Sequence, residues 1–230
     1  MFEYVRRDAE DRFVQERRLD GGSADAPQAN ERDSADYEYF LGVSLDELKD
    51  QRVLNIGTGK SGIFEREAVK KGAEVIALSP NFAYSGFSGQ EMRKAYELPV
   101  HRKVLRLLGM KTKSPCLVAG VAEDLPLDDG SIDMVVALYS VPLYSTDTVK
   151  TFQEIFRVLA DGGKAVLYPI SETKKASIEE ILSQLPVEDV LFESIAEGGD
   201  SVYRGETVFR VSFKKVSAKY EDLSQNHIQA

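Results

Sequence analysis

The sequence predicts a doubly wound α/β fold, in which a seven-stranded sheet is parallel except for its last strand and carries an N-terminal helical appendage. Three observations support this. Short apolar runs alternate with amphipathic helical segments from Arg52 onward. A glycine-rich turn joins the first of these runs to a helix. The last run, at 207–213, alternates apolar and polar residues, which suits an antiparallel strand.

Composition divides the chain into three parts. Residues 1–35 are expected to form a helical segment and a linker, because an apolar stripe at helical spacing is followed by residues 21–33, which have no periodicity. The stripe consists of Phe2, Val5, Ala9 and Phe13. A helix this short needs a partner surface, so we expect residues 1–20 to fold back over the site as a lid. Residues 36–216 form the main domain, and residues 217–230 form a polar tail.

Within the main domain, each element follows from its local pattern. Ser44 and Glu47 form a capping box, which predicts a short helix that ends before Arg52. Helical periodicity predicts further helices at 61–71, 146–159 and 177–185. Apolar runs predict strands at 53–56, 74–78, 116–119, 134–138, 165–170, 190–195 and 207–213. The stretch between the second and third strands exceeds what one crossover helix requires, so we interpret residues from about 80 to 115 as an insertion that could carry a lid.

The composition argues against several classes of function. The 230 residues include 29 Lys and Arg against 38 Asp and Glu, and the net charge of −9 argues against general nucleic-acid binding and against attachment to anionic membranes. With one cysteine, Cys116, and two histidines, His101 and His227, no intrachain disulfide is possible and no metal site is expected. No apolar signal region or run of about 18 apolar residues occurs, so we expect a soluble cytoplasmic protein.

The strongest local signal is the glycine-rich turn at 57–62, between an expected strand and an expected helix. Gly57 and Gly59 let the backbone bend tightly and approach a ligand without a Cβ in the way. This context favours a nucleotide-like ligand, and a plain tight turn is the alternative. A triphosphate-binding Walker loop is excluded, because position 54, where its first glycine must stand, is Leu.

Two downstream segments narrow the choice of ligand. Residues 122–137 read AEDLPLDDGSIDMVVA, and residues 152–167 read FQEIFRVLADGGKAVL. Together with the glycine turn, in this order and spacing, they resemble the class I S-adenosylmethionine-dependent methyltransferases of the small type 11 family. That family's pattern includes A-E-x-L-P, a strand that opens with S-F-D, and E-x-x-R-V-L-x-P-G-G. The resemblance covers residues 52 to about 170 and implies the fold, S-adenosylmethionine as cofactor and methyl transfer as activity.

The resemblance also implies where the cofactor binds. The glycine turn would pass beneath its methionine part and ribose, and the end of the second strand would meet the ribose hydroxyls. Residues 122–123 would flank the adenine, largely through backbone groups, and the residue after the fourth strand would lie near the reactive methyl group. The cofactor-binding residues so implied are Gly57, Thr58, Gly59, Gly62, Ser79, Pro80, Ala122, Glu123 and Tyr139.

The acceptor site is less defined in the sequence. Ser140 follows the fourth strand, Tyr144 could line the acceptor site, and His101 could reach over it from the insertion. For Tyr144 an ordinary half-buried aromatic is the alternative, and for His101 an exposed histidine. Asp133 is interpreted as a residue of strand entry, and no general base stands out.

The insertion carries a local excess of positive charge. Residues 93–113 include seven Lys and Arg against Glu97 alone, which suggests a small or medium-sized anionic acceptor; a solvated basic helix face is the alternative. Lys and Arg on the other helices are expected to lie on solvated faces. Gly162 and Gly163 are interpreted as a structural turn into the fifth strand.

Three positions depart from the family's pattern, because Asn55, Ser79 and Val121 stand where the family carries acids. A neutral residue loses the charge-assisted hydrogen bonds that a carboxylate makes to ribose hydroxyls. A second interpretation is therefore a catalytically silent, methyltransferase-like binding or regulatory protein. A third interpretation is a nicotinamide-dependent reductase. It is disfavoured because the chain lacks the acid that binds the ribose about 20 residues after the glycine turn, and because this interpretation leaves the downstream motifs unexplained.

Overall fold

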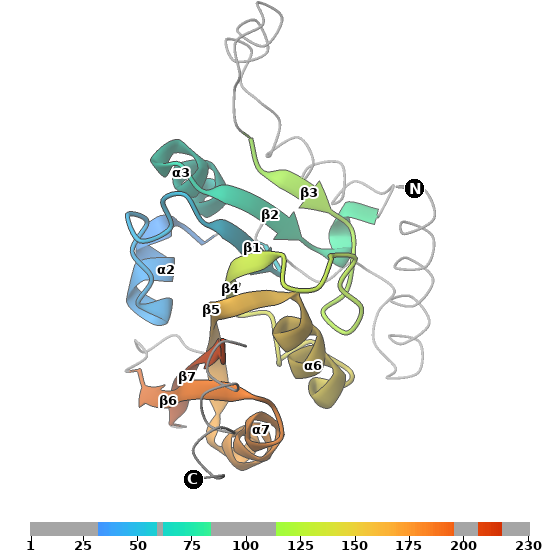
Figure 1. Ribbon diagram of the computed structural model, residues 1–230. Coiled ribbons are helices and arrows are strands. Elements are labelled where there is room, and N and C mark those ends of the chain that lie inside the picture. The colour runs from blue at the N-terminus through green and yellow to red at the C-terminus, as the bar shows by residue number, and fades with distance from the viewer. Residues whose placement is uncertain (1–31, 59–61, 84–113, 196–206, 218–230) are drawn as a thin grey trace, which may run out of the picture.

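The computed structural model describes residues 32–58, 62–83, 114–195 and 207–217, which form a layered α/β structure (Figure 1). The helix expected within 1–20, the insertion with His101, the polar tail and Gly59 of the turn lie outside these residues.

The described residues contain one seven-stranded sheet in the order β3-β2-β1-β4-β5-β7-β6. The pairs between β3 and β5 are parallel, and β7 is antiparallel to both of its neighbours, β5 and β6. The predicted fold class, including the antiparallel last strand, is confirmed. The strands are β1 (Arg52–Ile56), β2 (Glu74–Leu78), β3 (Cys116–Val118), β4 (Ile132–Leu138), β5 (Leu159–Ser171), β6 (Val187–Ser194) and β7 (Val208–Lys215).

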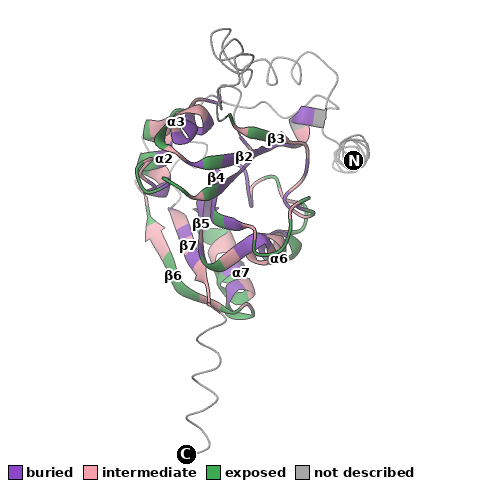
Figure 2. Cartoon of the chain, turned by 45° about the horizontal axis from the view of Figure 1, so that its top comes forward, coloured by how far each residue is buried: buried purple, intermediate pink, exposed green. Residues whose placement is uncertain are grey.

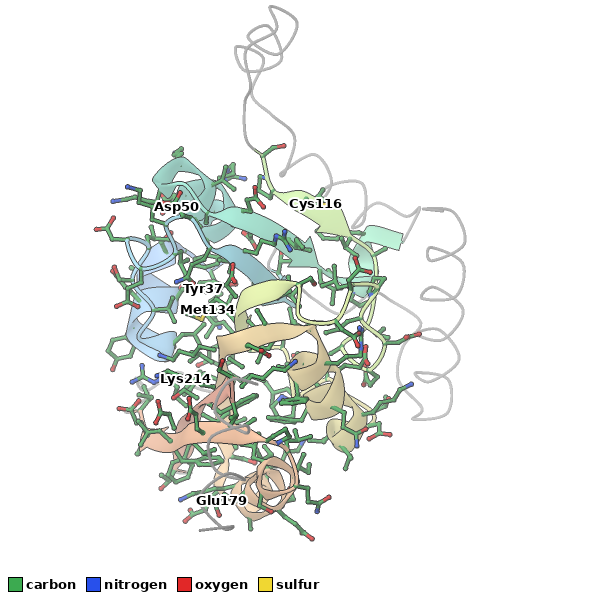
Figure 3. The ribbon with its side chains drawn as sticks, in the orientation of Figure 1. Tyr37, Asp50, Cys116, Met134, Glu179 and Lys214 are labelled. Carbon is green, nitrogen blue, oxygen red and sulfur yellow. The ribbon has the colours of Figure 1, made fainter. Side chains whose placement is uncertain are left out.

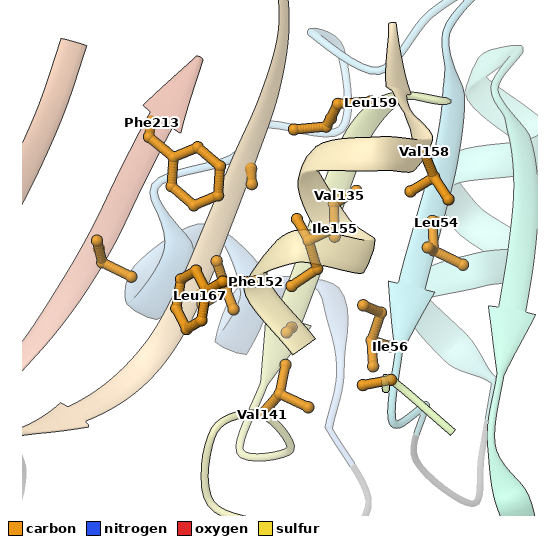
Figure 4. Packing of buried hydrophobic residues seen from close by; sticks show 14 of the residues in the cluster. Leu54, Ile56, Val135, Val141, Phe152, Ile155, Val158, Leu159, Leu167 and Phe213 are labelled. Carbon is orange, nitrogen blue, oxygen red and sulfur yellow. The ribbon is translucent and has the colours of Figure 1, made fainter. Parts of the chain in front are cut away.

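Helices cover both faces of the sheet, because successive side chains of a strand point to opposite faces. One face packs against α2 (Ser34–Leu41) and α3 (Ile63–Lys71). The other face packs against α6 (Thr148–Val158) and α7 (Glu172–Ser183). Figure 4 shows this second core, in which α6 brings Phe152 and Ile155 onto Leu54 and Val135 of the central strands.

Two elements near the N-terminal end differ from the prediction. The sequence analysis did not predict α2, which begins at Ser34, so it runs across the expected boundary between residues 35 and 36. Asp33 caps it, because the Asp33 carboxylate accepts from the Asp36 amide and the Asp36 carboxylate accepts from the Asp33 amide. The helix expected after Ser44 is instead a run of turns with i to i+3 hydrogen bonds, although the Ser44 hydroxyl does accept from the Asp46 amide.

The fifth strand begins earlier than expected and contains the two glycines. Gly162 has a left-handed backbone (φ 75°), and the register between β4 and β5 shifts between Ile132 and Met134. A Cβ on Gly163 would lie 2.8 Å from the Ala160 carbonyl oxygen, so this close approach requires glycine. The glycine pair is therefore a bulge within β5 and not a turn that precedes it.

Both edge strands of the sheet carry exposed residues. β6 is an outer strand, and Val190 and Leu191 are among its exposed residues (Figure 2). Cys116 on the opposite edge strand, β3, is also exposed (Figure 3). None of the helices in the described ranges is long and apolar enough to cross a membrane.

Two of the recognised motifs bind each other across the fold, because Glu154 and Arg157 of α6 hold residues 125–129. The Glu154 carboxylate accepts from the Leu125 amide (2.8 Å) and from the Arg157 guanidinium. That guanidinium also donates to the carbonyl oxygens of Leu125 (2.9 Å) and Leu127 (2.8 Å) and to the Asp129 carboxylate (2.6 Å). The sequence analysis expected Lys and Arg on the helices to lie on solvated faces. Arg157 differs from this expectation, because its guanidinium is held by residues 125–129 and Glu154.

The contacts of Arg157 lead to a prediction about stability. Arg157→Met keeps much of the side chain's length but removes the donor from two carbonyl oxygens and from the carboxylates of Glu154 and Asp129. We expect the free energy of unfolding to fall by about 2 kcal/mol, since each lost hydrogen bond to a charged group costs about 1.5–3 kcal/mol and part of this cost is relieved by water. Lys150→Met, which removes a positive charge from an exposed position on the same helix, should change it little. Urea unfolding followed by circular dichroism measures both.

The same pair predicts a pH dependence. The hydrogen bond from Arg157 holds the pKa of Glu154 below its ordinary value, so the pair stabilises the fold above the unfolded carboxyl pKa of about 4. The difference in free energy of unfolding between the wild type and Arg157→Met should therefore be constant near neutral pH. It should shrink as the pH falls through the folded pKa of Glu154. A difference that does not change down to about pH 2, below the usual carboxyl range, would contradict this assignment.

Candidate functional site

The predicted site residues gather where three neighbouring parallel strands end. Gly57 follows β1, Ser79 follows β2 and Tyr139 follows β4, and β1 lies between the other two strands. The amides of Gly57 (2.9 Å) and Thr58 (3.4 Å) both donate to the carbonyl oxygen of Leu78 at the end of β2. In open α/β sheets, ligands bind outside the carboxyl ends of the strands, so this edge is the candidate site.

Gly57 is required by a close approach between the ends of β1 and β4. Its backbone is left-handed (φ 76°), and a Cβ on it would lie 2.1 Å from the Cβ of Ser140. The Ser140 hydroxyl donates to the carbonyl oxygen of Ile56 and so ties β4 to the glycine turn. Ser140, predicted as a substrate residue, thus has its hydroxyl committed to the backbone of β1. Further along the turn, Gly62 is the left-handed cap that opens α3.

The residues at the end of β2 are small and buried. Ser79 and Thr58 are each only 2% exposed, and the Ser79 amide donates to the Val118 carbonyl oxygen (3.1 Å). Pro80 begins a short 3-10 helix, η1 (Pro80–Ala83), in which Phe82 packs against Ala77. The described residues at this strand end therefore supply a neutral hydroxyl and an apolar wall.

The segment expected to flank an adenine is fixed by its own contacts. Ala122 belongs to the core, and the Glu123 carboxylate accepts from the Thr146 amide (2.7 Å) and hydroxyl (3.2 Å). Glu123 thereby joins the segment after β3 to the loop after β4. The Glu123 side chain is thus committed to Thr146, and the backbone contact of 122–123 with an adenine stays a prediction of the resemblance.

A buried polar cluster lies beneath the glycine turn, and the sequence analysis missed it. The Asn55 amide donates to the Tyr37 hydroxyl (2.8 Å) and to the Glu65 carboxylate (2.7 Å), and all three residues are buried. Tyr37 belongs to α2 (Figure 3), and its ring stacks on Phe64 of α3 at 3.9 Å between centroids. Burial, together with the charge of Glu65, raises the pKa of Tyr37, so the phenol stays neutral.

This cluster explains one of the departures from the family's pattern. Glu65 on α3 supplies a carboxylate beside the position where β1 has Asn instead of an acid. An acid at 55 would place two carboxylates together in the core, whereas the Asn55 amide donates a hydrogen bond to Glu65. Asn55 Oδ1, by contrast, is buried and has no hydrogen-bond partner within the described residues.

The aromatic residues near the end of β4 differ in their placement. Tyr144 is 66% exposed, and its amide donates to the Ser140 carbonyl oxygen. Tyr139, whose backbone has φ 52°, packs edge to face on Phe40 of α2 and on Tyr168 of β5, with centroids 5.7 and 5.5 Å apart. Arg32, just before α2, lies over the Tyr139 ring, with Cζ 4.5 Å from the centroid. Tyr139 is thus the site residue that joins β4, β5 and the N-terminal part of the chain.

The remaining expectations concern metal ligands and strand entry. The described ranges hold no group of three or more His, Cys, Asp or Glu residues placed to bind a metal ion. Asp133 accepts from the Arg52 amide (2.8 Å) and so joins the starts of β1 and β4, at the edge opposite the site.

The central half of the sequence matches a methyltransferase family model and proteins described as methyltransferases. A family model described as a methyltransferase domain matches residues 54–167. Proteins of Mycobacterium tuberculosis and Mycobacterium bovis, each described as an uncharacterized methyltransferase, are 30% identical over 114 residues, which cover 50% of this chain and 37% of theirs. The matched region thus spans little more than a third of the length of these curated relatives.

Solved structures share the fold at low sequence identity. A putative S-adenosylmethionine-dependent methyltransferase from Methanococcus maripaludis is 15% identical with a TM-score of 0.51, covering 80% of this chain and 83% of that one. The [4+2]-cyclase SpnF is 13% identical with a TM-score of 0.56, covering 94% and 96%. These likenesses concern the fold, which does not by itself select the chemistry.

The polar cluster leads to a prediction in which one substitution recovers the stability that another has lost. Asn55→Asp should lower the free energy of unfolding by about 2 kcal/mol at neutral pH, because a buried carboxylate would face that of Glu65 and the amide donor would be lost. Adding Glu65→Gln should recover most of this loss, because the new side-chain amide at position 65 can donate to the new carboxylate at position 55. Urea unfolding of the wild type, both single variants and the double variant measures the coupling; additive effects of the two changes would contradict it.

The glycine turn gives a second prediction with a matched control. Gly57→Ala and Gly162→Ala impose the same left-handed strain, since their φ values are 76° and 75°. At Gly162, however, a Cβ would meet nothing within 4 Å, whereas at Gly57 it would meet Ser140. Overpacking costs about 1–3 kcal/mol, so Gly57→Ala should be less stable than Gly162→Ala by about that amount. Thermal unfolding compares the two, and equal stabilities would show that Ser140 can move away without cost.

Proposed function

We propose that this chain, which belongs to the S-adenosylmethionine-dependent methyltransferase family, transfers a methyl group to a small or medium-sized anionic acceptor. The observation that carries the proposal is the convergence of Gly57, Ser79 and Tyr139 at the carboxyl ends of three adjacent parallel strands. The family implies S-adenosylmethionine as the cofactor. The acceptor and the activity itself are the parts that need testing.

The chemistry of the described residues fits this cofactor. Gly57 and Thr58 bring backbone close to the strand ends, and the buried Ser79 offers a hydroxyl for a ribose. The hydrogen bond from the Thr146 amide to Glu123 fixes the segment whose backbone would flank an adenine. No carboxylate is assigned to the ribose in this set, so we expect cofactor affinity to rest on shape and neutral hydrogen bonds more than on charge-assisted ones.

The role of the protein in this proposal is mainly alignment. S-adenosylmethionine supplies, when bound, a methyl group already activated on a sulfonium. The strand ends then need to bind the two reactants in fixed positions, and the covering segments need to exclude water, which is enough to speed such a step greatly. A general base would be needed only for a hydroxyl or a protonated amine as acceptor.

The anionic character of the acceptor is supported by the sequence of the insertion. Residues 93–113 carry seven Lys and Arg against one Glu in a chain of net charge −9. Such a local concentration of positive charge on an acidic protein attracts anions. We therefore infer an acceptor that bears a carboxylate or a phosphate group.

A silent binding protein is the second candidate, and one observation favours it. Ser79 is neutral where the family carries an acid, and the adjoining Phe82 already fills buried space against Ala77. In that case the end of β2 would be packed by the protein's own side chains and not shaped for a ribose.

Calorimetric titration separates the two candidates directly. The wild type should bind both S-adenosylmethionine and S-adenosylhomocysteine with a 1:1 stoichiometry. Heats no larger than those of dilution into buffer for either compound would count against the methyltransferase proposal and favour the silent protein.

Ser79→Asp gives a sharper form of this test. If the ribose lies at Ser79, the new carboxylate accepts both hydroxyls, and affinity for S-adenosylmethionine should rise by about 1–2 kcal/mol, roughly tenfold, after the cost of desolvating the carboxylate. If the space is filled, the substitution buries an unpaired charge. A lower melting temperature without any gain in affinity would then be observed.

A further inference from the structure

An arginine without a polar partner lies at the edge of the candidate site. Arg32 Nε is buried and has no hydrogen-bond partner, and the guanidinium makes no hydrogen bond or ion pair with the part of the chain that the structure describes. Its contact there is the one over the face of the Tyr139 ring, 4.5 Å from Cζ to the centroid. A buried N–H donor without an acceptor costs free energy, so its place next to a site needs an explanation.

Its surroundings also set its electrostatic character. The Tyr139 ring attracts the cation with its face but accepts no strong hydrogen bond, so the N–H groups of Arg32 stay available. The nearby buried phenol of Tyr37 is neutral, because its pKa is raised, and cannot neutralise the guanidinium. Arg32 is thus a fixed positive charge with unused donors.

The position of Arg32 on the sheet distinguishes two ligands that it could face. The glycine turn and Ser79 lie at the ends of β1 and β2, and Ala122 follows β3, next to β2. Arg32, Tyr139 and Phe40 lie instead at β4 and β5, because Tyr139 packs on Tyr168 and its amide donates to the Tyr168 carbonyl oxygen (2.7 Å). The residues expected to hold the methionine, ribose and adenine parts of the cofactor therefore occupy one half of this edge. Arg32 occupies the other half together with Tyr139, the residue expected near the reactive methyl group.

We propose that Arg32, held over Tyr139, binds the oxyanion of the methyl acceptor, a carboxylate or a phosphate. This assignment rests on the proposed methyl-transfer function. A guanidinium suits both groups, because its planar set of donors can make two parallel hydrogen bonds to them. Arg32 is then the residue that selects anionic acceptors, and Tyr139 and Phe40 position it. The charge comes from the segment that precedes α2 and not from the parallel strands.

The side-chain Nε–H of Arg32 allows a direct test in the full-length protein. In protein labelled with ¹⁵N-arginine, its NMR signal is assigned by its absence from Arg32→Lys and is followed during titration with benzoate, phenyl phosphate and, as a neutral control, benzyl alcohol. Both anions should shift the signal to saturation, and the tighter one identifies the acceptor's group. Benzyl alcohol should leave it unchanged. No saturable shift with either anion would overturn the proposal.

Two variants provide the controls. By calorimetry, Arg32→Lys, which keeps the charge but loses the planar donor set, should bind the better anion about tenfold more weakly, the cost of one charge-assisted hydrogen bond. Lys164→Gln, which removes a positive charge from the residue of β5 that pairs with Met134 near the start of β4, should bind it as the wild type does. Equal affinity in wild type and Arg32→Lys would mean that charge alone attracts the anion and would overturn the assignment of Arg32.

Titration with S-adenosylhomocysteine separates this proposal from the preceding one. Arg32→Lys should bind it within about twofold of the wild type. A loss of about tenfold or more would place Arg32 on the cofactor and overturn its assignment to the acceptor. If the wild type binds the anions at Arg32 but not S-adenosylhomocysteine, the methyltransferase proposal fails while the oxyanion site itself is supported.

Discussion

The hydrogen bonds of the Asn55 amide are the constraint on which the site depends. They join the central strand β1 to Tyr37 of α2 and to Glu65 of α3, directly beneath the turn that begins at Gly57. Because all three residues are buried, each polar group depends on the others to replace the water it has lost. The cluster fixes the start of α3 relative to the strand.

A second constraint acts from the other face of the sheet. Glu154 and Arg157 of α6 hold the segment from Leu125 to Asp129 by hydrogen bonds to its backbone and to a carboxylate. This segment follows the residues proposed to flank an adenine. The two constraints are independent, since they use opposite faces of the sheet, yet each fixes one side of the same edge.

The edge itself divides into two halves with different chemistry. The ends of β1 and β2 offer backbone, a neutral hydroxyl and small residues. The ends of β4 and β5 offer the ring of Tyr139, which packs on the buried Tyr168, and the charge of Arg32. A group-transfer enzyme must hold two reactants with their reacting atoms close, and such a division suits that requirement. Likeness of fold alone could not have shown it, since the same fold also occurs in a [4+2]-cyclase.

The sequence alone determined the alternation of strands and helices, the antiparallel last strand and the family. Strand pairing and helix amphipathicity leave periods of about 2 and 3.6 residues in the chain, and these are local signals. The sequence did not predict α2, because its eight residues are mostly polar or aromatic and show no clear apolar stripe.

The sequence also could not pair Asn55 with Tyr37, Arg157 with Leu125 or Arg32 with Tyr139. These partners stand far apart along the chain, and a side-chain contact over such separations leaves no period in the sequence. Only the tertiary structure decides which polar groups meet, and these contacts explain why position 55 is neutral and why Arg157 is committed to residues 125–129.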